Sequence, residues 1–429
     1  MEIDNFVKQL DKICDEFAIN VEEGTTDEVR FSGNRIDLNN KWYYPSYHIF
    51  AAKGKKTGEI SFDQLESWEK QLNNISSIID HAPENPDFCG INPVKFNYHH
   101  NGIDSEFDLN DISGEMIRGS MDGGADSTAG LSYLHNIKNR IITTWNDQEY
   151  FESGLEFVVR SFKDKNSGQE ALHFGIDSMK SADPYETGGE AAKTATIIDK
   201  KTSIDEGRYE VLFSPYTMGT VLSYNMNFLS YYSINAGLSP FIDKIGKNVA
   251  SENVTIYDDP LNTRGAGARP VDQEGTATDK VNLIDHGILK NYLHSYSTGK
   301  LSGNVSTGNA GIMEPLPWQL HMSGGNYDLD DMIHGMKKGL FINNSWYTRF
   351  QDESNGIFST VPRDGVFLIE NGEIAGAVSG IRISDSILNI LQNVSQVSKQ
   401  EKYVKWWDEI HPSIIPYALV KNVNITKGF

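Results

Sequence analysis

Cysteine is scarce in this sequence. Its 429 residues include only Cys14 and Cys89, which cannot build a disulfide framework or a cysteine-based metal cluster. We expect both thiols to be buried. A chain without structural disulfides is typical of a reducing compartment, so we expect a cytoplasmic protein.

Basic residues are outnumbered, and long apolar runs are missing. The 38 Lys and Arg face 59 Asp and Glu, which gives a formal net charge of -21. Phosphate backbones and anionic membrane surfaces bind clustered Lys and Arg, so this charge argues against both as partners. No run approaches the ~20 apolar residues of a membrane span. The start, MEIDNFVKQLDKI, also lacks the basic and apolar segments of a signal peptide.

The histidines form no zinc motif. None of the 11 is followed by glutamate, and no two are four or five residues apart. A helical zinc site of the H-E-x-x-H kind places its two histidines four residues apart on one helix face. Such a site is therefore excluded for this chain.

Periodicity predicts an α+β protein with two smaller mixed domains and a β-rich C-terminal domain. The first domain, residues 1–82, alternates a helix, antiparallel strands around a turn at Asn34-Arg35, and a second helix. Residues 83–107 are rich in Pro, Asn and Gly and indicate a linker. Residues 108–206 form the central α+β domain. The C-terminal domain, residues 207–429, contains a buried helix over 217–234, because that segment is apolar on most sides.

Residues 251–309 form the most densely punctuated stretch. Two apolar runs, 281–284 and 288–293, predict a hairpin that turns at His286-Gly287. The glycine loop 264–270 is followed by Pro270 and Asp272 rather than by a helix, so a surface loop is favoured over a phosphate site.

Four carboxylates lie in this stretch: Asp258, Asp259, Asp272 and Glu274. Paired carboxylates suit acid–base chemistry or a divalent cation. Asp-Pro and Asp-Gln-Glu-Gly are equally ordinary turn sequences. The residues alone leave both interpretations open.

The same stretch resembles the TldD/PmbA family, also called the modulator of DNA gyrase family of metalloproteases. The resemblance covers nearly the whole chain and is most specific in the C-terminal domain. It rests on these segments: Val254-Thr-Ile-Tyr-Asp-Asp259, the glycine loop, Val271-Asp-Gln-Glu-Gly275, Leu283-Ile-Asp-His-Gly-Ile-Leu-Lys-Asn-Tyr-Leu293, Ser306-Thr-Gly-Asn309 and Phe367-Leu-Ile-Glu-Asn-Gly-Glu-Ile374.

The resemblance implies which branch of the family this chain is similar to. In the TldD branch, a helix before the dense stretch carries H-E-x-x-x-H, and a later cysteine helps to hold zinc. Here Ser223 and Phe228 replace the histidines, Tyr224 replaces the glutamate, and no cysteine follows Cys89. Phenylalanine cannot bind a metal, and neutral serine and tyrosine are poor zinc ligands. We therefore expect no metal, cofactor or catalytic residue in this chain, as in the PmbA (TldE) branch, and zinc only in a TldD-type partner.

The resemblance thus predicts the non-zinc subunit of a TldD/TldE-type protease that degrades or trims unfolded or modified peptides. The peptide would lie extended against sheet edges. Candidate groove-lining residues are Asp258, Asp259, Asp272, Glu274, Thr307 and Asn309. Two alternatives stay open: a stand-alone hydrolase with a rearranged metal site at the four carboxylates, and a peptide-binding homodimeric scaffold. The isolated chain is compatible with a homodimer or with a heteromer.

Overall fold

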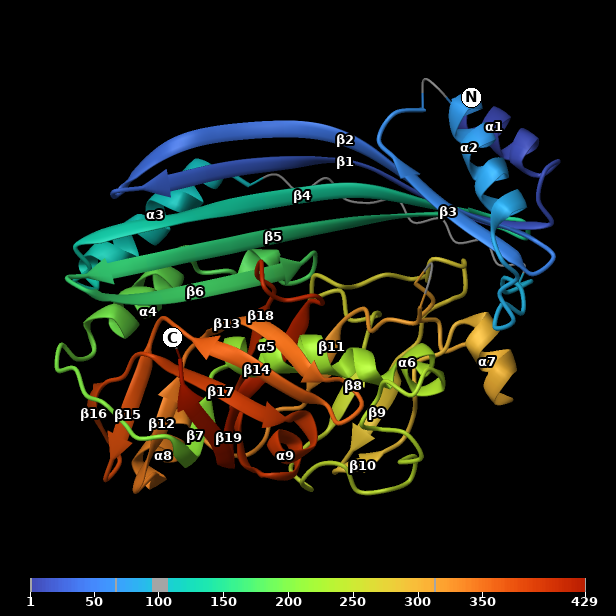
Figure 1. Ribbon diagram of the computed structural model, residues 1–429. Coiled ribbons are helices and arrows are strands. Elements are labelled where there is room, and N and C mark those ends of the chain that lie inside the picture. Colours follow the sequence, from blue (N-terminus) through green and yellow to red (C-terminus); the bar gives the residue numbers. More distant parts are fainter. Residues whose placement is uncertain (1, 66–67, 95–106, 312–313, 429) are drawn as a thin grey trace.

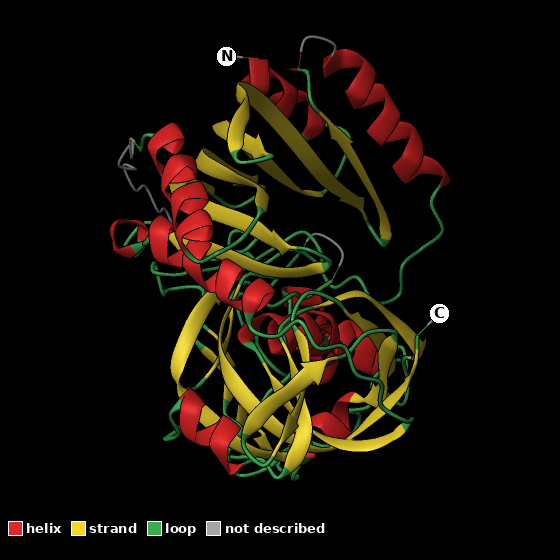
Figure 2. Ribbon diagram, turned by 90° about the vertical axis from the view of Figure 1, so that its left-hand side faces the viewer, coloured by secondary structure: helices red, strands yellow, loops and turns green. Residues whose placement is uncertain are grey.

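The computed structural model describes residues 2–65, 68–94, 107–311 and 314–428. A long curved sheet from the N-terminal half arches over a β-rich C-terminal domain (Figure 1). Seen from the side, helices flank the long sheet, and strands make up most of the C-terminal domain (Figure 2). The predicted α+β class is confirmed. None of the described helices combines the length and the apolar character that a membrane crossing requires.

The arched sheet is antiparallel throughout, in the order β3–β2–β1–β4–β5–β6. Its strands are β1 (Glu16–Ser32), β2 (Arg35–Lys53), β3 (Lys56–Phe62), β4 (Ser127–Thr143), β5 (Asp147–Lys163) and β6 (Asn166–Gly175). Long-range pairing carries each strand through its polar residues. β1 pairs with β2 on one side and with β4 on the other. The predicted units 1–82 and 108–206 therefore share one sheet.

Helices cover one face of this sheet. They are α1 (Glu2–Leu10), α2 (Trp68–His81), α3 (Leu109–Asp122) and α4 (Pro184–Thr196). Asp108 and Asp183 cap α3 and α4 by accepting hydrogen bonds from first-turn backbone N–H groups. Of the predicted linker 83–107, residues 83–94 form neither a helix nor a named strand. Residues 95–106 lie outside the described residues.

One expectation about the cysteines is wrong. Cys14 is buried, but Cys89 is exposed. Its neighbour Phe88 occupies the core position instead and packs with Ala18, Ala52 and Ile91. Because the side chain of Phe88 points into the core, the side chain of the next residue, Cys89, points to the surface.

In the C-terminal domain, β19 pairs with β7, β11, β17 and β18, which makes it the central strand. The strands are β7 (Gly207–Phe213), β8 (Ile256–Asp258), β9 (Val281–Asp285), β10 (Ile288–Leu289), β11 (Leu320–Met322), β12 (Lys338–Ile342), β13 (Ser345–Asp352), β14 (Ile357–Pro362), β15 (Val366–Glu370), β16 (Glu373–Ala377), β17 (Ile381–Ser386), β18 (Val394–Val404) and β19 (Ser413–Lys427). The helices are α5 (Pro215–Asn225), α6 (Tyr231–Asn235), α7 (Tyr296–Ser302), α8 (Leu329–Gly335) and α9 (Ile387–Gln392), with the short 3₁₀ turn η3 (Met226–Leu229). Another 3₁₀ turn, η2 (Met179–Ser181), lies before this domain, between β6 and α4.

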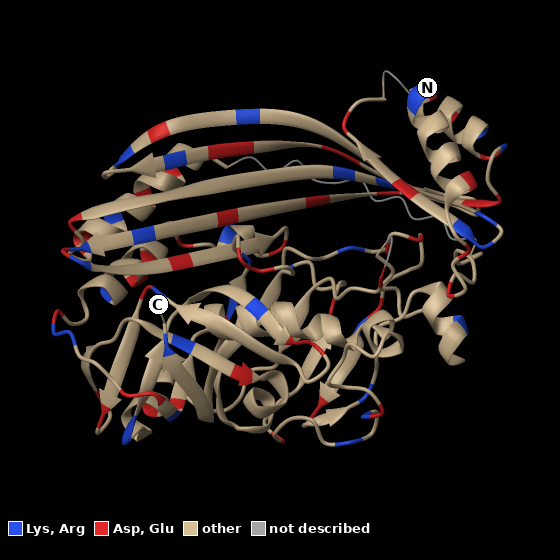
Figure 3. Ribbon diagram, in the orientation of Figure 1, with Lys and Arg blue, Asp and Glu red and all other residues tan. Residues whose placement is uncertain are grey.

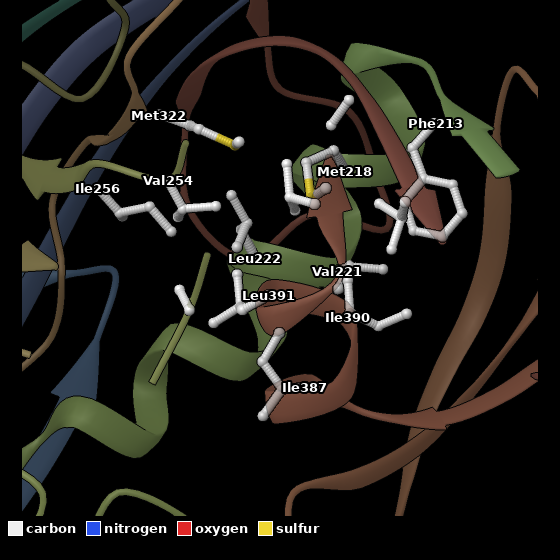
Figure 4. Packing of buried hydrophobic residues seen from close by; sticks show 14 of the residues in the cluster. Phe213, Met218, Val221, Leu222, Val254, Ile256, Met322, Ile387, Ile390 and Leu391 are labelled. Carbon is white, nitrogen blue, oxygen red and sulfur yellow. The ribbon is translucent and has the colours of Figure 1, made fainter. Parts of the chain in front are cut away.

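Helix α5 lies in the core of this domain. Ser214 caps it by accepting hydrogen bonds from Tyr216 N and Thr217 N, and Pro215 occupies its first turn. Its residues Met218, Val221 and Leu222 are fully buried. Figure 4 shows them surrounded by side chains that include Val254, Ile256, Met322 and Leu391. This packing confirms the predicted buried helix.

The predicted helix 217–234 does not continue to its expected end. It stops at Asn225 and passes through the 3₁₀ turn η3 into α6. Asn225 Nδ2 donates to Val221 O at 2.8 Å, and Asn227 Nδ2 donates to Ser223 O at 3.3 Å. These side-chain amides compete with the backbone donors that would extend the helix. The break falls between the positions of Ser223 and Phe228.

Candidate functional site

The position that resembles the zinc motif lies where α5 ends, against the 405–412 loop between β18 and β19. Ser223 is fully buried there. Its Oγ accepts hydrogen bonds from Ile410 N at 2.7 Å and from His411 N at 2.9 Å. The hydroxyl of Ser223 therefore fastens this loop to the helix.

This arrangement does not fit a zinc ion. Two N–H groups direct their positive ends at Ser223 Oγ, where a cation would need an electron pair. The one nearby histidine, His411, is hydrogen bonded through Nε2 to Asn227 Oδ1 at 2.9 Å. Burial lowers the pKa of His411 to about 3, so its ring is neutral. His411 Nε2 is therefore bound to the side-chain amide of Asn227 and is not available to a metal ion.

Aromatic packing occupies the other two motif positions. Phe228 contacts the ring of Phe350 on β13, with centroids 4.6 Å apart. Tyr224 packs edge-on against the same ring at 6.3 Å and donates through its hydroxyl to Asp408 Oδ1 at 3.4 Å. Burial raises the pKa of Tyr224, so the phenol keeps its proton. Neither side chain is free to act as a metal ligand or as a general base.

A buried glutamate of the 405–412 loop, Glu409, lies beside α5 one helical turn before Ser223. Glu409 packs against Gly219, where a Cβ would come within 2.7 Å of Glu409 Oε1. Neither carboxyl oxygen of Glu409 has a hydrogen-bond partner among the described residues. Burial raises its pKa well above the usual range and lowers that of Lys405, whose ammonium donates to the Glu409 carbonyl. This carboxyl beside α5 therefore takes up a proton more readily than an exposed glutamate does.

Three of the four candidate carboxylates accept hydrogen bonds from neighbouring loops. Asp258 is fully buried and accepts from Trp318 N at 2.9 Å, from Gln319 N at 2.7 Å and from Asn309 Nδ2 at 2.6 Å. Burial raises the pKa of Asp258 to about 6. Asp258 and Asn309, which are 51 residues apart, are thus joined directly.

Asp272 has the same role in the next loop. Its carboxylate accepts from Glu274 N at 3.0 Å, Thr276 N at 2.8 Å and Ala310 N at 3.0 Å. Burial raises its pKa to about 7. Glu274 accepts from Tyr296 N at 3.1 Å, and its pKa is raised well above the usual range by burial and then by Asp272. The consecutive residues 309 and 310 therefore tie Asp258 and Asp272 to one segment.

The remaining candidates lie at the edge of this network. Asp259 faces Lys280 at 3.8 Å. Thr307 Oγ1 accepts from His294 N at 2.9 Å. Within the described ranges, the carboxylates of the four acidic candidates do not converge with a third His, Cys, Asp or Glu in the geometry of a metal site. The structure thus brings Asp258, Asp272 and Asn309 together in a hydrogen-bonded network that connects loops.

Sequence reasoning missed the partners that close the α5 position. His411 and Asn227 are 184 residues apart, and Ser223 and Ile410 are 187 apart. His411 is followed by Pro412 and belongs to no recognisable sequence motif, so its contact with α5 could not be predicted. Only the fold shows that the 405–412 loop returns to α5.

Comparison with known proteins agrees with this fold. Residues 206–427 match the family described as the PmbA/TldA metallopeptidase C-terminal domain. A metalloprotease of Methanocaldococcus jannaschii is 30% identical over 236 residues, which are 53% of this chain and 51% of that protein. A metalloprotease PmbA homologue of Buchnera aphidicola is 27% identical over 243 residues, 55% of this chain and 52% of that protein.

Among solved structures, TldE from Thermococcus kodakarensis superposes with a TM-score of 0.81. It is 18% identical and covers 99% of this chain and 100% of its own. The match to the C-terminal domain spans more than half of the chain, so the chain belongs to the PmbA/TldA metallopeptidase family. The matched part spans about half the length of the first curated relatives.

Proposed function

We propose that this chain is the non-zinc, TldE/PmbA-like subunit of a TldD/TldE-type metalloprotease that degrades or processes unfolded or modified peptides. One observation carries the proposal: Ser223 Oγ accepts two backbone hydrogen bonds at the motif position that would hold a zinc ligand. Zinc hydrolases need an open metal position and a base beside it. Tyr224 and Phe228 supply neither, so the chemistry belongs to a zinc-bearing partner.

An exposed aromatic patch supports a partner at this position. It consists of Trp407 and Tyr347, whose exposed fractions are 60% and 45%, and the exposed Ile410 (46%) follows three residues after Trp407. Trp407 packs edge-on against Tyr347 at 5.8 Å, so the two rings are held in place before any partner binds. Large exposed aromatic groups mark the centres of protein interfaces. Ile410 also donates to Ser223, which connects the patch to the replaced motif.

The arched sheet offers an edge for an extended peptide. β6 pairs with β5 only from Gly154 onwards, so the described strands leave β5 unpaired on that side over residues 147–153. A cavity of about 210 Å³ adjoins this edge, lined by Tyr150, Glu152 and the glycine-loop residues Ala266 and Arg269. A peptide added to a sheet edge is recognised through its backbone, which suits varied unfolded sequences. Charge there is mixed across the two strands, because Asp147 and Glu149 on β5 form ion pairs with Arg140 and Lys138 on β4 (Figure 3).

The test is to mix this chain with a paralogue that carries H-E-x-x-x-H. We expect a stable complex by size-exclusion chromatography with light scattering, and cleavage of an unfolded peptide that depends on both chains. If the mixture gives neither a complex nor altered peptidase activity, the proposal is wrong. Stoichiometric complex formation also decides between this role and that of a homodimeric scaffold.

A further inference from the structure

A cluster of side chains of the metal-ligand type lies on the arched sheet and shares no residue with the motif positions on α5. It consists of His135 on β4, Glu156 on β5 and His173 on β6, three strands that run side by side (Figure 1). One nitrogen of each imidazole and one oxygen of the carboxylate all lie within 4.8 Å of one another. Among the described residues, only these three of the His, Cys, Asp and Glu side chains converge in this way.

The strand register places the three side chains on one face. His173 is directly opposite Glu156, and His135 is directly opposite Gly154, two residues before Glu156. Residues two apart on a strand point to the same side. This face is turned to the C-terminal domain. Val158, the residue of β5 that follows Glu156 on the same face, packs with Trp406 of that domain.

Gly154 provides the space for the cluster. A Cβ at this position would lie 2.7 Å from His173 Nε2. Any other residue would therefore push the imidazole of His173 away from the strand. A glycine in the interior of a strand weakens the strand and often marks a place where another group comes close to the backbone. At Gly154 that group is the imidazole of His173.

The ring nitrogens of this cluster are less occupied by hydrogen bonds than those of His321. His173 Nδ1 is buried and has no hydrogen-bond partner among the described residues. His135 Nε2 lies 3.8 Å from Glu156 Oε2, which is too far for a hydrogen bond but suits two ligands of one ion. His135 Nδ1 is held by Thr26 Oγ1 at 3.0 Å, the kind of outer contact that orients a metal-bound imidazole. By contrast, His321 uses Nδ1 on Tyr257 and Nε2 on Glu401.

We propose that His135, Glu156 and His173 bind one divalent transition-metal ion of the zinc class. Two imidazoles and one carboxylate are a common zinc ligand set, and they leave a coordination position for water. The side chains of His135 and Glu156 are 25% and 17% exposed, so an ion can reach them from solvent. This site is separate from the replaced motif on α5 and does not depend on the proposed partner.

Lys405 sets the affinity of this site. Its ammonium interacts electrostatically with both Glu156 and His173. It is anchored by donating to the backbone carbonyl of Glu409. A nearby positive charge opposes a bound cation, so removal of Lys405 should strengthen metal binding. A purely structural role for the three side chains would predict no such gain.

The experiment is a titration of the metal-free full chain, without a histidine tag, with Co²⁺ followed by visible absorption and then competition with Zn²⁺. We expect one ion per chain. His173→Ala and the isosteric Glu156→Gln should each weaken binding by at least about 10-fold, the scale of losses at metal-site positions. Lys405→Met should tighten it. Circular dichroism at each step checks that the variants are folded.

Two histidines provide matched controls. His48 faces Glu59 at 3.3 Å on neighbouring strands of the same sheet, and His321 faces Glu401 at 3.1 Å. His48→Gln and His321→Gln should leave the dissociation constant unchanged. The proposal is overturned if the folded chain binds no stoichiometric ion, or if Glu156→Gln binds as tightly as the wild type. Neither result bears on complex formation with a TldD-type paralogue, so the two proposals fail separately.

Discussion

Ser223 and His411 are joined by a 2.9 Å hydrogen bond from the backbone N–H of His411 to the hydroxyl of Ser223. This contact makes the Ser223 hydroxyl a structural fastening between α5 and the 405–412 loop.

Ser223→Ala tests this fastening. The substitution leaves two buried N–H groups, those of Ile410 and His411, without an acceptor. We expect a loss of about 1–3 kcal/mol in the free energy of unfolding. Denaturant unfolding measures it, with Ser77→Ala in α2, at an exposed position, as the control. An equal effect at both positions would contradict the role of Ser223.

His411 makes stability depend on pH. Its pKa falls from 6.5 to about 3 on folding because it is buried, so the unfolded chain binds a proton more readily. The contribution of His411 is complete above pH 6.5 and is lost as pH falls towards 3, with a slope of up to about 1.4 kcal/mol per pH unit. Unfolding free energies of wild type and His411→Gln, measured from pH 4 to pH 8, should converge at the acidic end. A constant difference across that range would argue against this account.

Asp258 and Asp259 are adjacent and should behave differently. Asp258 is fully buried with three donors, whereas Asp259 faces Lys280 near the surface. Asp258→Asn places an amide N–H₂ among N–H donors and should cost about 1–3 kcal/mol. Asp259→Asn should cost about 1 kcal/mol or less, as is usual for such a pair. Thermal unfolding and limited proteolysis of the 259–279 loop would show the contrast, and equal losses would disprove it.

Trp407 tests the partner surface. Its exposed fraction of 60% means that Trp407→Ala should change the melting temperature little. If the patch is the interface, the same substitution should weaken binding of the zinc-bearing paralogue by about 30-fold, the scale of an interface hot spot. Isothermal titration calorimetry measures this, and Tyr43→Ala, an exposed aromatic residue on β2, is the control. Equal binding by wild type and Trp407→Ala would remove the patch from the interface.

Local signals in the sequence were sufficient for parts of the fold. The hairpin turns at His286-Gly287 as predicted, with φ of 44° and 81°, but its second strand ends at Leu289 rather than at Leu293. The turn at Asn34 joins β1 and β2, also with a positive φ of 66°. These features depend on residues close together in the chain, where turn chemistry decides the conformation.

Long-range features could not be predicted. The pairing of β1 with β4, the break of the predicted helix at Asn225 and the hydrogen bond between Asp258 and Asn309 all join distant segments. For the carboxylates, the sequence left a metal site and turn chemistry open. Only the positions of their backbone donors show that Asp258 and Asp272 hold loops.

The most direct test locates the catalytic chemistry in a mixture of this chain with a TldD-type paralogue. Cleavage of an unfolded peptide is compared for three mixtures: wild type, this chain as Tyr224→Phe, and the paralogue with its motif glutamate changed to glutamine. The account predicts that Tyr224→Phe retains activity and that the paralogue variant has none. Peptide cleavage by this chain alone, or cleavage that survives loss of the paralogue's glutamate, would contradict it.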